Sequence, residues 1–186
     1  VVAQWCQTDG VLITGRNVRF ENSTVTDNAQ VYGGVGWCEG VPAYHGIKAT
    51  RSPVTIKGNT VYNNCGNGIY SITASIENNS VFNNYITNIY GTIIKSNVSQ
   101  CEFSPHTGIT FTGGANVYQN YVSGCENGIV SGGIVYASIK ENLVVGDTIR
   151  LIHNAWGTTV QGNNTSLPIV VLYPSGVTLA DNYLLE

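Results

Sequence analysis

The residues best suited to chemistry lie in one stretch of the chain, residues 29–51, which reads "AQVYGGVGWCEGVPAYHGIKATR". His45 or Lys48 could serve there as a general base, and Arg51 could neutralise a carboxylate of a substrate. Together these groups suit removal of a proton from the carbon next to a carboxylate. The stretch contains a single carboxylate, Glu39, whereas a glycoside hydrolase uses a pair of them, so that class of enzyme is excluded.

The rest of the sequence gives little support to metal, cofactor or nucleic-acid chemistry. The 11 Asp and Glu residues are spread along the chain, and no cluster of Cys and His has metal-ligand spacing, so we expect neither a metal nor a cofactor. The eight Lys and Arg residues are scattered in a chain of net charge −3, which does not favour a nucleic-acid partner. No apolar run approaches the roughly 20 residues of a membrane span.

The elements that position these residues are predicted to be the coils of a repeat. An apolar residue followed three positions later by Asn recurs about every 21 residues. The residues in the Asn place are Asn59, Asn79, Asn97, Asn120, Asn142, Asn163 and Asn182, with Ser23 in an earlier copy. A second column of apolar residues contains Ile47, Ile69, Ile89, Ile109, Ile129, Ile149 and Ile169. Two strand signals in each repeat predict an all-β solenoid of about eight coils.

Stacked coils would bury the apolar columns in one continuous interior, with equivalent strands parallel and about 4.8 Å apart. The Asn side chains are predicted to bond the backbone of their own turn and the Asn of neighbouring coils, which makes an internal Asn ladder. We expect a single domain over residues 1–186. Residues 1–8 are predicted to form an N-terminal strand or arm, and residues 29–46 a loop inserted into one coil.

The repeats resemble a known family. The segments "NTVYNNCGNGIYSITAS", "NSVFNNYITNIYGT", "NYVSGCENGIVSGG" and "NLVVGDTIRLI" are similar to the parallel β-helix repeats of the pectin-lyase-like superfamily, over roughly residues 9–186. The resemblance implies a right-handed single-stranded parallel β-helix. It leaves function open, because that superfamily includes polysaccharide lyases, glycoside hydrolases, epimerases, phage tailspikes and adhesins. In such a fold the proton-abstraction chemistry would be that of a polysaccharide lyase.

Alternation along the strands places one set of side chains on the outer face. The residue after each apolar residue of the second column points outward, and in stacking order these residues are Leu12, Lys48, Tyr70, Tyr90, Thr110, Val130, Arg150 and Val170. Tyr70 and Tyr90, with Trp37 and Tyr44 of the inserted loop, are candidate glycan contacts, since their rings can stack on sugars. Lys48 in the same column could meet a carboxylate.

The five Cys residues cannot all pair within one chain. Cys65 and Cys125 occupy the same place in coils three apart, which separates them by roughly 14 Å and excludes a bridge between them. We expect Cys65, Cys101 and Cys125 to be buried thiols. Cys6 and Cys38 lie in less regular segments and could pair with each other.

The chain begins with Val and contains no Met, from which we expect a mature secreted protein with its leader removed. Five sequons agree with an extracellular location. The glycosylation candidates are Asn22, Asn78, Asn97, Asn163 and Asn164.

The leading functional hypothesis from the sequence is an extracellular structural protein that assembles with copies of itself into a filament or surface layer. No amphipathic helix is visible at either end, and an uncovered strand edge templates association. The alternative is a polysaccharide lyase or a glycan-binding module acting on an acidic polysaccharide. The scattered acids depart from the catalytic members of the superfamily, which favours a protein without enzymatic activity.

Overall fold

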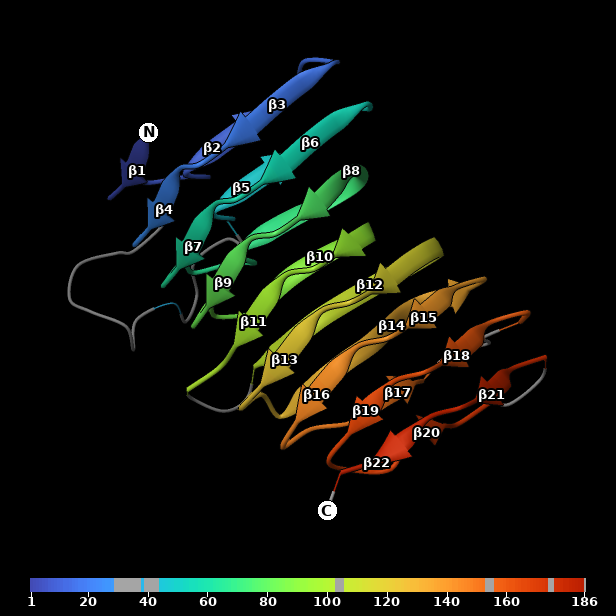
Figure 1. Ribbon diagram of the computed structural model, residues 1–186. Helices are drawn as coiled ribbons and strands as arrows, with labels where there is room; N and C mark the ends of the chain where they lie inside the picture. Colours follow the sequence, from blue (N-terminus) through green and yellow to red (C-terminus); the bar gives the residue numbers. More distant parts are fainter. Residues whose placement is uncertain (29–37, 39–43, 103–105, 153–155, 174–175, 186) are drawn as a thin grey trace.

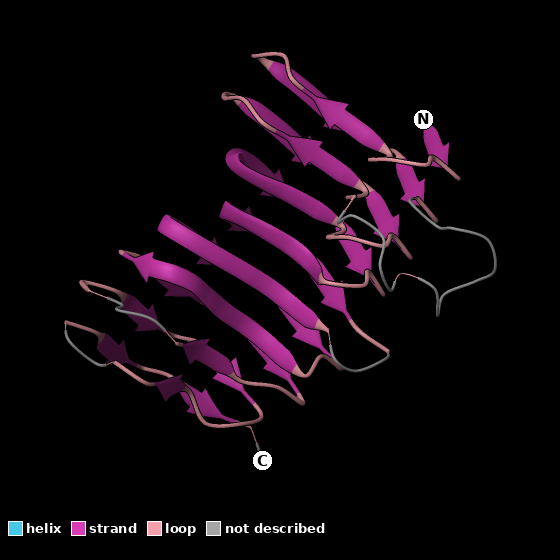
Figure 2. Cartoon of the chain, turned by 180° about the vertical axis from the view of Figure 1, so that it is seen from behind, coloured by secondary structure: helices cyan, strands magenta, loops and turns pink. Residues whose placement is uncertain are grey.

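The computed structural model describes residues 1–28, 38, 44–102, 106–152, 156–173 and 176–185. In these residues the chain forms strands joined by turns and loops, with no helix (Figure 2). Every strand pair is parallel, and the coils stack along one axis, with the N-terminus at one end and the C-terminus at the other (Figure 1). The predicted all-β parallel solenoid is confirmed.

One side of the solenoid is a sheet of short strands, one from each coil. In spatial order they are β1 (Val2–Gln4), β4 (Thr24–Thr26), β7 (Thr60–Tyr62), β9 (Ser80–Phe82), β11 (Val98–Gln100), β13 (Tyr121–Ser123), β16 (Leu143–Val145), β19 (Asn164–Thr165) and β22 (Tyr183–Leu184). This first sheet follows the turn that carries the Asn column, so the Asn place is set at its edge.

The second sheet covers the other sides of the coil. Its main path is β2 (Val11–Ile13), β5 (Ile47–Ala49), β8 (Ile69–Glu77), β10 (Thr87–Lys95), β12 (Thr107–Tyr118), β14 (Asn127–Val135), β17 (Ile149–Leu151) and β20 (Val170–Val171). The strands β3 (Val18–Glu21), β6 (Val54–Lys57), β15 (Ser138–Lys140), β18 (Thr159–Gln161) and β21 (Thr178–Ala180) extend the sheet beyond a bend. Register shifts within β10 and β12 mark that bend in the long strands.

The interior is built from the apolar columns predicted from the repeat. The buried residues of the second column are Ile47, Ile69, Ile89, Ile109, Ile129 and Ile149, and those before the Asn places are Ile56, Ile76, Ile94, Val117, Ile139 and Val160. All of them are fully buried. Burying one such side chain contributes about 1.5–3 kcal/mol, so the stack of coils supplies what a single coil cannot.

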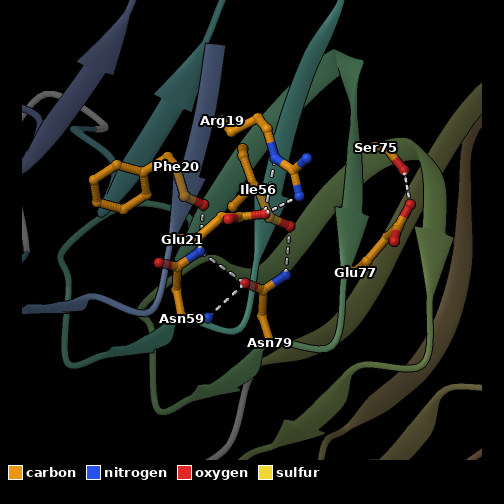
Figure 3. A network of polar contacts seen from close by, with 8 residues as sticks. All are labelled: Arg19, Phe20, Glu21, Ile56, Asn59, Ser75, Glu77 and Asn79. Atoms are coloured by element: carbon orange, nitrogen blue, oxygen red, sulfur yellow. Dashed lines mark hydrogen bonds and ion pairs between the residues drawn. The ribbon is translucent and has the colours of Figure 1, made fainter.

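The predicted Asn ladder is confirmed, and Figure 3 shows two of its rungs. The Asn79 Oδ1 atom accepts both the backbone N–H of Asn59, at 2.9 Å, and the Asn59 Nδ2 group, at 3.0 Å. Nδ2 of Asn59 also donates to the Phe20 carbonyl, and Nδ2 of Asn79 to the Ile56 carbonyl, each at 3.0 Å. The same pattern continues to Asn182, and Ser23 takes the first place with its N–H on Asn59 Oδ1.

Each ladder residue is presented by a turn residue in the left-handed backbone region. These preceding residues are Asn22, Gly58, Asn78, Ser96, Gln119, Glu141, Gly162 and Asp181, with φ between 50° and 65°. Asn and Gly adopt this region most readily. The segments "ENN" at residues 77–79 and "GN" at residues 58–59 and 162–163 place one of these two residue types directly before a ladder Asn. Residues such as Glu141 are held there by the ladder against a cost of about 1–3 kcal/mol.

A second buried polar column at the other end of the first sheet was not predicted. Asn28, Asn64 and Asn84 donate in turn from Nδ2 to the next Oδ1, and Asn84 donates to Asn88 Oδ1 at 3.0 Å. The residues that follow β11, β13 and β16 continue this column, and they are Cys101, Cys125 and Asp147. From the N-terminal to the C-terminal end of the stack, the side chains of this column therefore change from amides to a disulfide and then to a buried carboxyl.

The disulfide expectations were wrong. The structure pairs Cys38 with Cys65 and Cys101 with Cys125, and leaves Cys6 free, so Cys6 and Cys38 do not pair and the three expected thiols are oxidised. Cys101 and Cys125 follow equivalent strands of successive coils, with Cα atoms 4.8 Å apart, which is one coil spacing. Cys38, from the inserted loop, lies against the coil of Cys65. The expectation that Cys65 and Cys125 do not pair is confirmed.

Candidate functional site

The candidate site is the outward column on the first half of the second sheet, whose predicted alignment is confirmed residue by residue. The column runs Leu12, Lys48, Tyr70, Tyr90, Thr110, Val130, Arg150 and Val170. The cations Lys48 and Arg150 lie five coils apart, a span of about 24 Å. Between them lie the hydroxyl groups of Tyr70, Tyr90 and Thr110.

The aromatic side chains of this site are stacked on one another. The His45 ring lies 4.7 Å from the Tyr70 ring at an interplanar angle of 7°, and the Tyr70 ring lies 5.0 Å from that of Tyr90 at 19°. Both faces of Tyr70 are therefore covered. A ligand meets the edge and hydroxyl of Tyr70, which makes it a hydrogen-bonding group here rather than a platform for a sugar ring.

His45 is buried, stacks on Tyr70 and makes two hydrogen bonds. Its backbone N–H donates to Asp9 Oδ1 at 2.7 Å, and its Nδ1 accepts the backbone N–H of Asn67 at 3.2 Å. Burial lowers the pKa of the His45 imidazole, while Asp9 raises it and Lys48 lowers it. A neutral ring with Nδ1 occupied carries its proton on Nε2. The geometry thus favours a positioning role, in which His45 supports Tyr70, over a role as a general base.

Lys48 and Arg51 are not brought together. Lys48 Nζ lies 3.8 Å from Asp9 Oδ2, and its side chain is one-third exposed. Arg51 follows β5 at the bend before β6, where its carbonyl accepts a hydrogen bond from the Thr73 hydroxyl. No contact in the described residues joins the Arg51 side chain to His45 or Lys48. A base and a neutralising cation are therefore not assembled around one position.

The inserted loop contributes less to the described site than the sequence suggested. Trp37 lies outside the described residues. Tyr44 is half-buried and packs against the Cys38–Cys65 disulfide. The part of the loop that the structure describes is thus tied to the coil next to the stacked rings.

Arg150 was predicted from the sequence to lie in the outward column, but it was not predicted to be a site residue. Its Nη1 donates to Asn127 Oδ1 at 2.5 Å, and its Nε is buried without a partner in the described part of the chain. The signal that could have found it is the register alone, since Arg150 follows Ile149 as Lys48 follows Ile47.

The five glycosylation candidates lie in different surroundings. Asn97 and Asn163 belong to the buried ladder, where their Nδ2 groups donate to Asn120 and Asn182, so neither amide can carry a glycan in the folded chain. Asn22 and Asn78 occupy exposed left-handed turn positions, and Asn164 is half-buried on β19. Glycosylation of these three stays a prediction.

Three further findings concern metal binding, membrane spans and the redox environment. Among the described residues no three His, Cys, Asp or Glu side chains come close enough together to hold a metal ion. No helix in the described ranges is long and apolar enough to cross a membrane. The two disulfides indicate an oxidising environment.

Comparison with known proteins agrees with the fold. A family model described as "Right handed beta helix region" matches residues 1–149, which is most of the chain. Searches against characterised proteins and against solved structures found no match. The family match accounts for the coils and ladders, and it carries no statement about a ligand or a reaction.

Proposed function

We propose, from the premise that this chain belongs to the right-handed beta helix family, that it is an extracellular β-helix that binds an acidic polysaccharide along its outward column. One observation carries the proposal. Lys48 and Arg150 lie at the two ends of one stretch of the outward column, with the hydroxyl groups of Tyr70, Tyr90 and Thr110 between them. We call this stretch, from Lys48 to Arg150, the track.

The track suits an extended, negatively charged chain of sugars. Its ends can pair with carboxylates about 24 Å apart, and its middle offers hydroxyl groups to sugar oxygens. The Asp9 carboxylate holds Lys48, and Asn127 holds Arg150, so both cations are oriented before a ligand arrives. Such preorganisation lowers the entropy cost of binding.

The proposal is binding without catalysis. A lyase needs a base with a free lone pair beside the substrate and a cation on the same carboxylate. His45 is buried with Nδ1 engaged, and no described contact joins Arg51 to the site. The catalytic assignment of His45, Lys48 and Arg51 therefore has less support than the binding assignment.

The test is electrophoresis of the purified chain in gels containing alginate or polygalacturonate. We expect retardation by these polymers and none by a neutral glucan. Lys48→Gln should weaken the retardation by about fivefold, corresponding to about 1 kcal/mol for one charged contact. Lys57→Gln, on the far side of the bend, is the matched control and should behave as the wild type. Equal retardation of Lys48→Gln and wild type would remove the proposed track. Release of an ultraviolet-absorbing unsaturated product would instead establish a lyase.

Self-association is a second candidate, favoured by the surface of the last coil. Leu179 and Leu184 are in register with the buried Val160 and Thr165, yet they are 53% and 60% exposed. They line a hollow of about 410 Å³. A second copy that stacks its own coil there would cover these apolar side chains and pair with the strands of this coil.

Sedimentation across a concentration series tests this candidate. We expect assemblies that Leu179→Asp disrupts, while Ile72→Asp, an equally exposed apolar position on the side of the solenoid, leaves them intact. A monomer at every concentration would contradict self-association and would leave the polysaccharide proposal untouched.

A further inference from the structure

A separate hollow of about 260 Å³ lies at the corner where the strands of the first sheet end. It spans three successive coils, because Phe82, Gln100 and Ser123 are in register at the ends of β9, β11 and β13. Glu102 and Gly124, from the turns after β11 and β13, complete it. The outward column of the second sheet does not contribute to it.

An aromatic ring forms one wall of this hollow. One face of the Phe82 ring is covered by Tyr62, with the ring centroids 4.8 Å apart and the rings nearly parallel. Tyr62 belongs to the preceding coil, whereas the next coil has Gln100 in register with Phe82. Phe82 and Gln100 both line the hollow, and the half-buried Phe82 side chain supplies its aromatic wall.

The other walls are polar side chains with free hydrogen-bonding capacity. Gln100 and Glu102 are exposed and Ser123 is half-buried, and no described contact satisfies any of the three side chains. An amide, a carboxylate and a hydroxyl group thus line the hollow together with the half-buried ring of Phe82.

A disulfide and a hydrogen bond hold the turns at the hollow. The Cys101–Cys125 disulfide joins the coil of β11 to the coil of β13. The Glu102 backbone N–H donates to Asn83 Oδ1 at 2.9 Å. Gly124 has φ of +69°, and a side chain there would begin 2.4 Å from the Cys101 carbonyl oxygen. Only glycine fits this approach, so the turn after β13 stays close to the one below it.

We propose that this hollow binds a single neutral sugar residue. The apolar C–H face of a pyranose packs on an aromatic face, and its hydroxyl groups pair with amide, carboxylate and hydroxyl side chains. The volume is below that of pockets for larger ligands, which suits one ring. Glu102 repels an acidic sugar, so this site selects against the ligand proposed for the second sheet.

The test is a titration of the isotope-labelled whole chain, followed by amide chemical shifts, with methyl glycosides of glucose, galactose and mannose. At least one glycoside should shift the amides of Glu102 and Gly124 with millimolar affinity. Phe82→Leu keeps the apolar bulk but removes the ring face, and should weaken binding by about fivefold. Ser123→Val should block the hollow, and it is compatible with the fold because Val145 occupies the next place in the same column.

The matched control is Tyr118→Leu, which removes a ring on β12 of the other sheet, outside both proposed sites, and should leave the affinity unchanged. The proposal is overturned if no glycoside shifts these amides, or if Phe82→Leu and Ser123→Val both bind as the wild type does. Equally tight binding of a methyl galacturonoside would overturn the assignment to neutral sugars. All these results are independent of retardation by acidic polymers, so the two proposals stand or fall separately.

Discussion

Asp147 occupies a place in the second polar column that Asn64 and Asn84 fill in earlier coils. In those residues Nδ2 donates to the carbonyl two positions back, that of Tyr62 or Phe82, at 3.0 Å. Asp147 keeps the acceptor role, since Oδ2 takes the Cys125 N–H at 3.0 Å, but its Oδ1 is buried without a donor in the described residues. Burial raises the pKa of the Asp147 carboxyl, and the Cys125 hydrogen bond opposes that rise.

Asp147→Asn should stabilise the protein at neutral pH, by about 1–3 kcal/mol, because it supplies a donor where an oxygen is unsatisfied. The folded state holds the Asp147 proton more tightly than the unfolded state does. The stabilisation from the proton bound to Asp147 is therefore fully present below the ordinary pKa of an aspartate. It is lost as the pH rises through the raised pKa of Asp147.

Urea unfolding of both proteins at pH 4 and pH 7 measures this effect. The gain from Asp147→Asn should be larger at pH 7 than at pH 4. A gain that is equal at the two pH values, or larger at pH 4, would contradict the assignment of a raised pKa to this carboxyl.

At the scale of elements, the strands and the first ladder could be predicted because each repeats the same residue types at the same spacing. One strand column is marked in the sequence by Ile69, Ile89 and Ile109. One turn is marked in the same way by Asn59, Asn79 and Asn97. The second column escaped prediction because its chemistry changes along the stack from Asn84 to Cys101. Cys65 and Cys125 each lie four residues before an Ile of the second column, whereas Cys101 lies eight residues before Ile109, so its alignment with Cys125 is not visible in the repeat.

The candidate site shows the same limit. Register fixed which residues share the outer column, and so placed Lys48 beside Tyr70. It could not show that the His45 ring covers Tyr70, because His45 precedes the strand and its position depends on Asp9 and Asn67. Side-chain packing of this kind is decided by contacts between coils that no single repeat encodes.

Ladder positions should differ in importance according to their place in the stack. Asn120→Ala removes the acceptor for Asn97 and an amide NH₂ whose two hydrogens are shared among three oxygen atoms, and should cost about 3 kcal/mol or more. Asn182→Ala, at the half-buried last rung, should cost about 1 kcal/mol. Denaturant unfolding compares the two, and equal losses would mean that the ladder does not act through buried hydrogen bonds.

For the whole molecule, the two disulfides link segments that lie close in space and moderately far apart in sequence. Cys38 and Cys65 are 27 residues apart, and Cys101 and Cys125 are 24 residues apart. Each bridge restricts the unfolded chain, and loops of this length contribute about 3 kcal/mol. In a solenoid, where each coil contacts only its neighbours, such a bridge holds its own pair of coils.

The double variant Cys101→Ala/Cys125→Ala should lose about 3 kcal/mol of unfolding free energy. It should also loosen the hollow proposed to bind a sugar, because Cys101 is one of the residues that line it. Cys6→Ala is the control, since this thiol is free, and should change the unfolding free energy little. Unfolding monitored by fluorescence gives both values, and a loss as large for Cys6→Ala would contradict the assigned pairing.

The first ladder repeats the same contacts from coil to coil, with one amide on the next amide from Asn59 to Asn182. Duplicating a coil that carries neither a disulfide nor Asp147 would therefore add one more copy of contacts that this ladder already makes. In evolutionary terms the molecule can change length by one coil at a time. The separation of Lys48 and Arg150 would then change in steps of about 4.8 Å. If the proposed function holds, the number of coils between them sets the length of polysaccharide that can contact both.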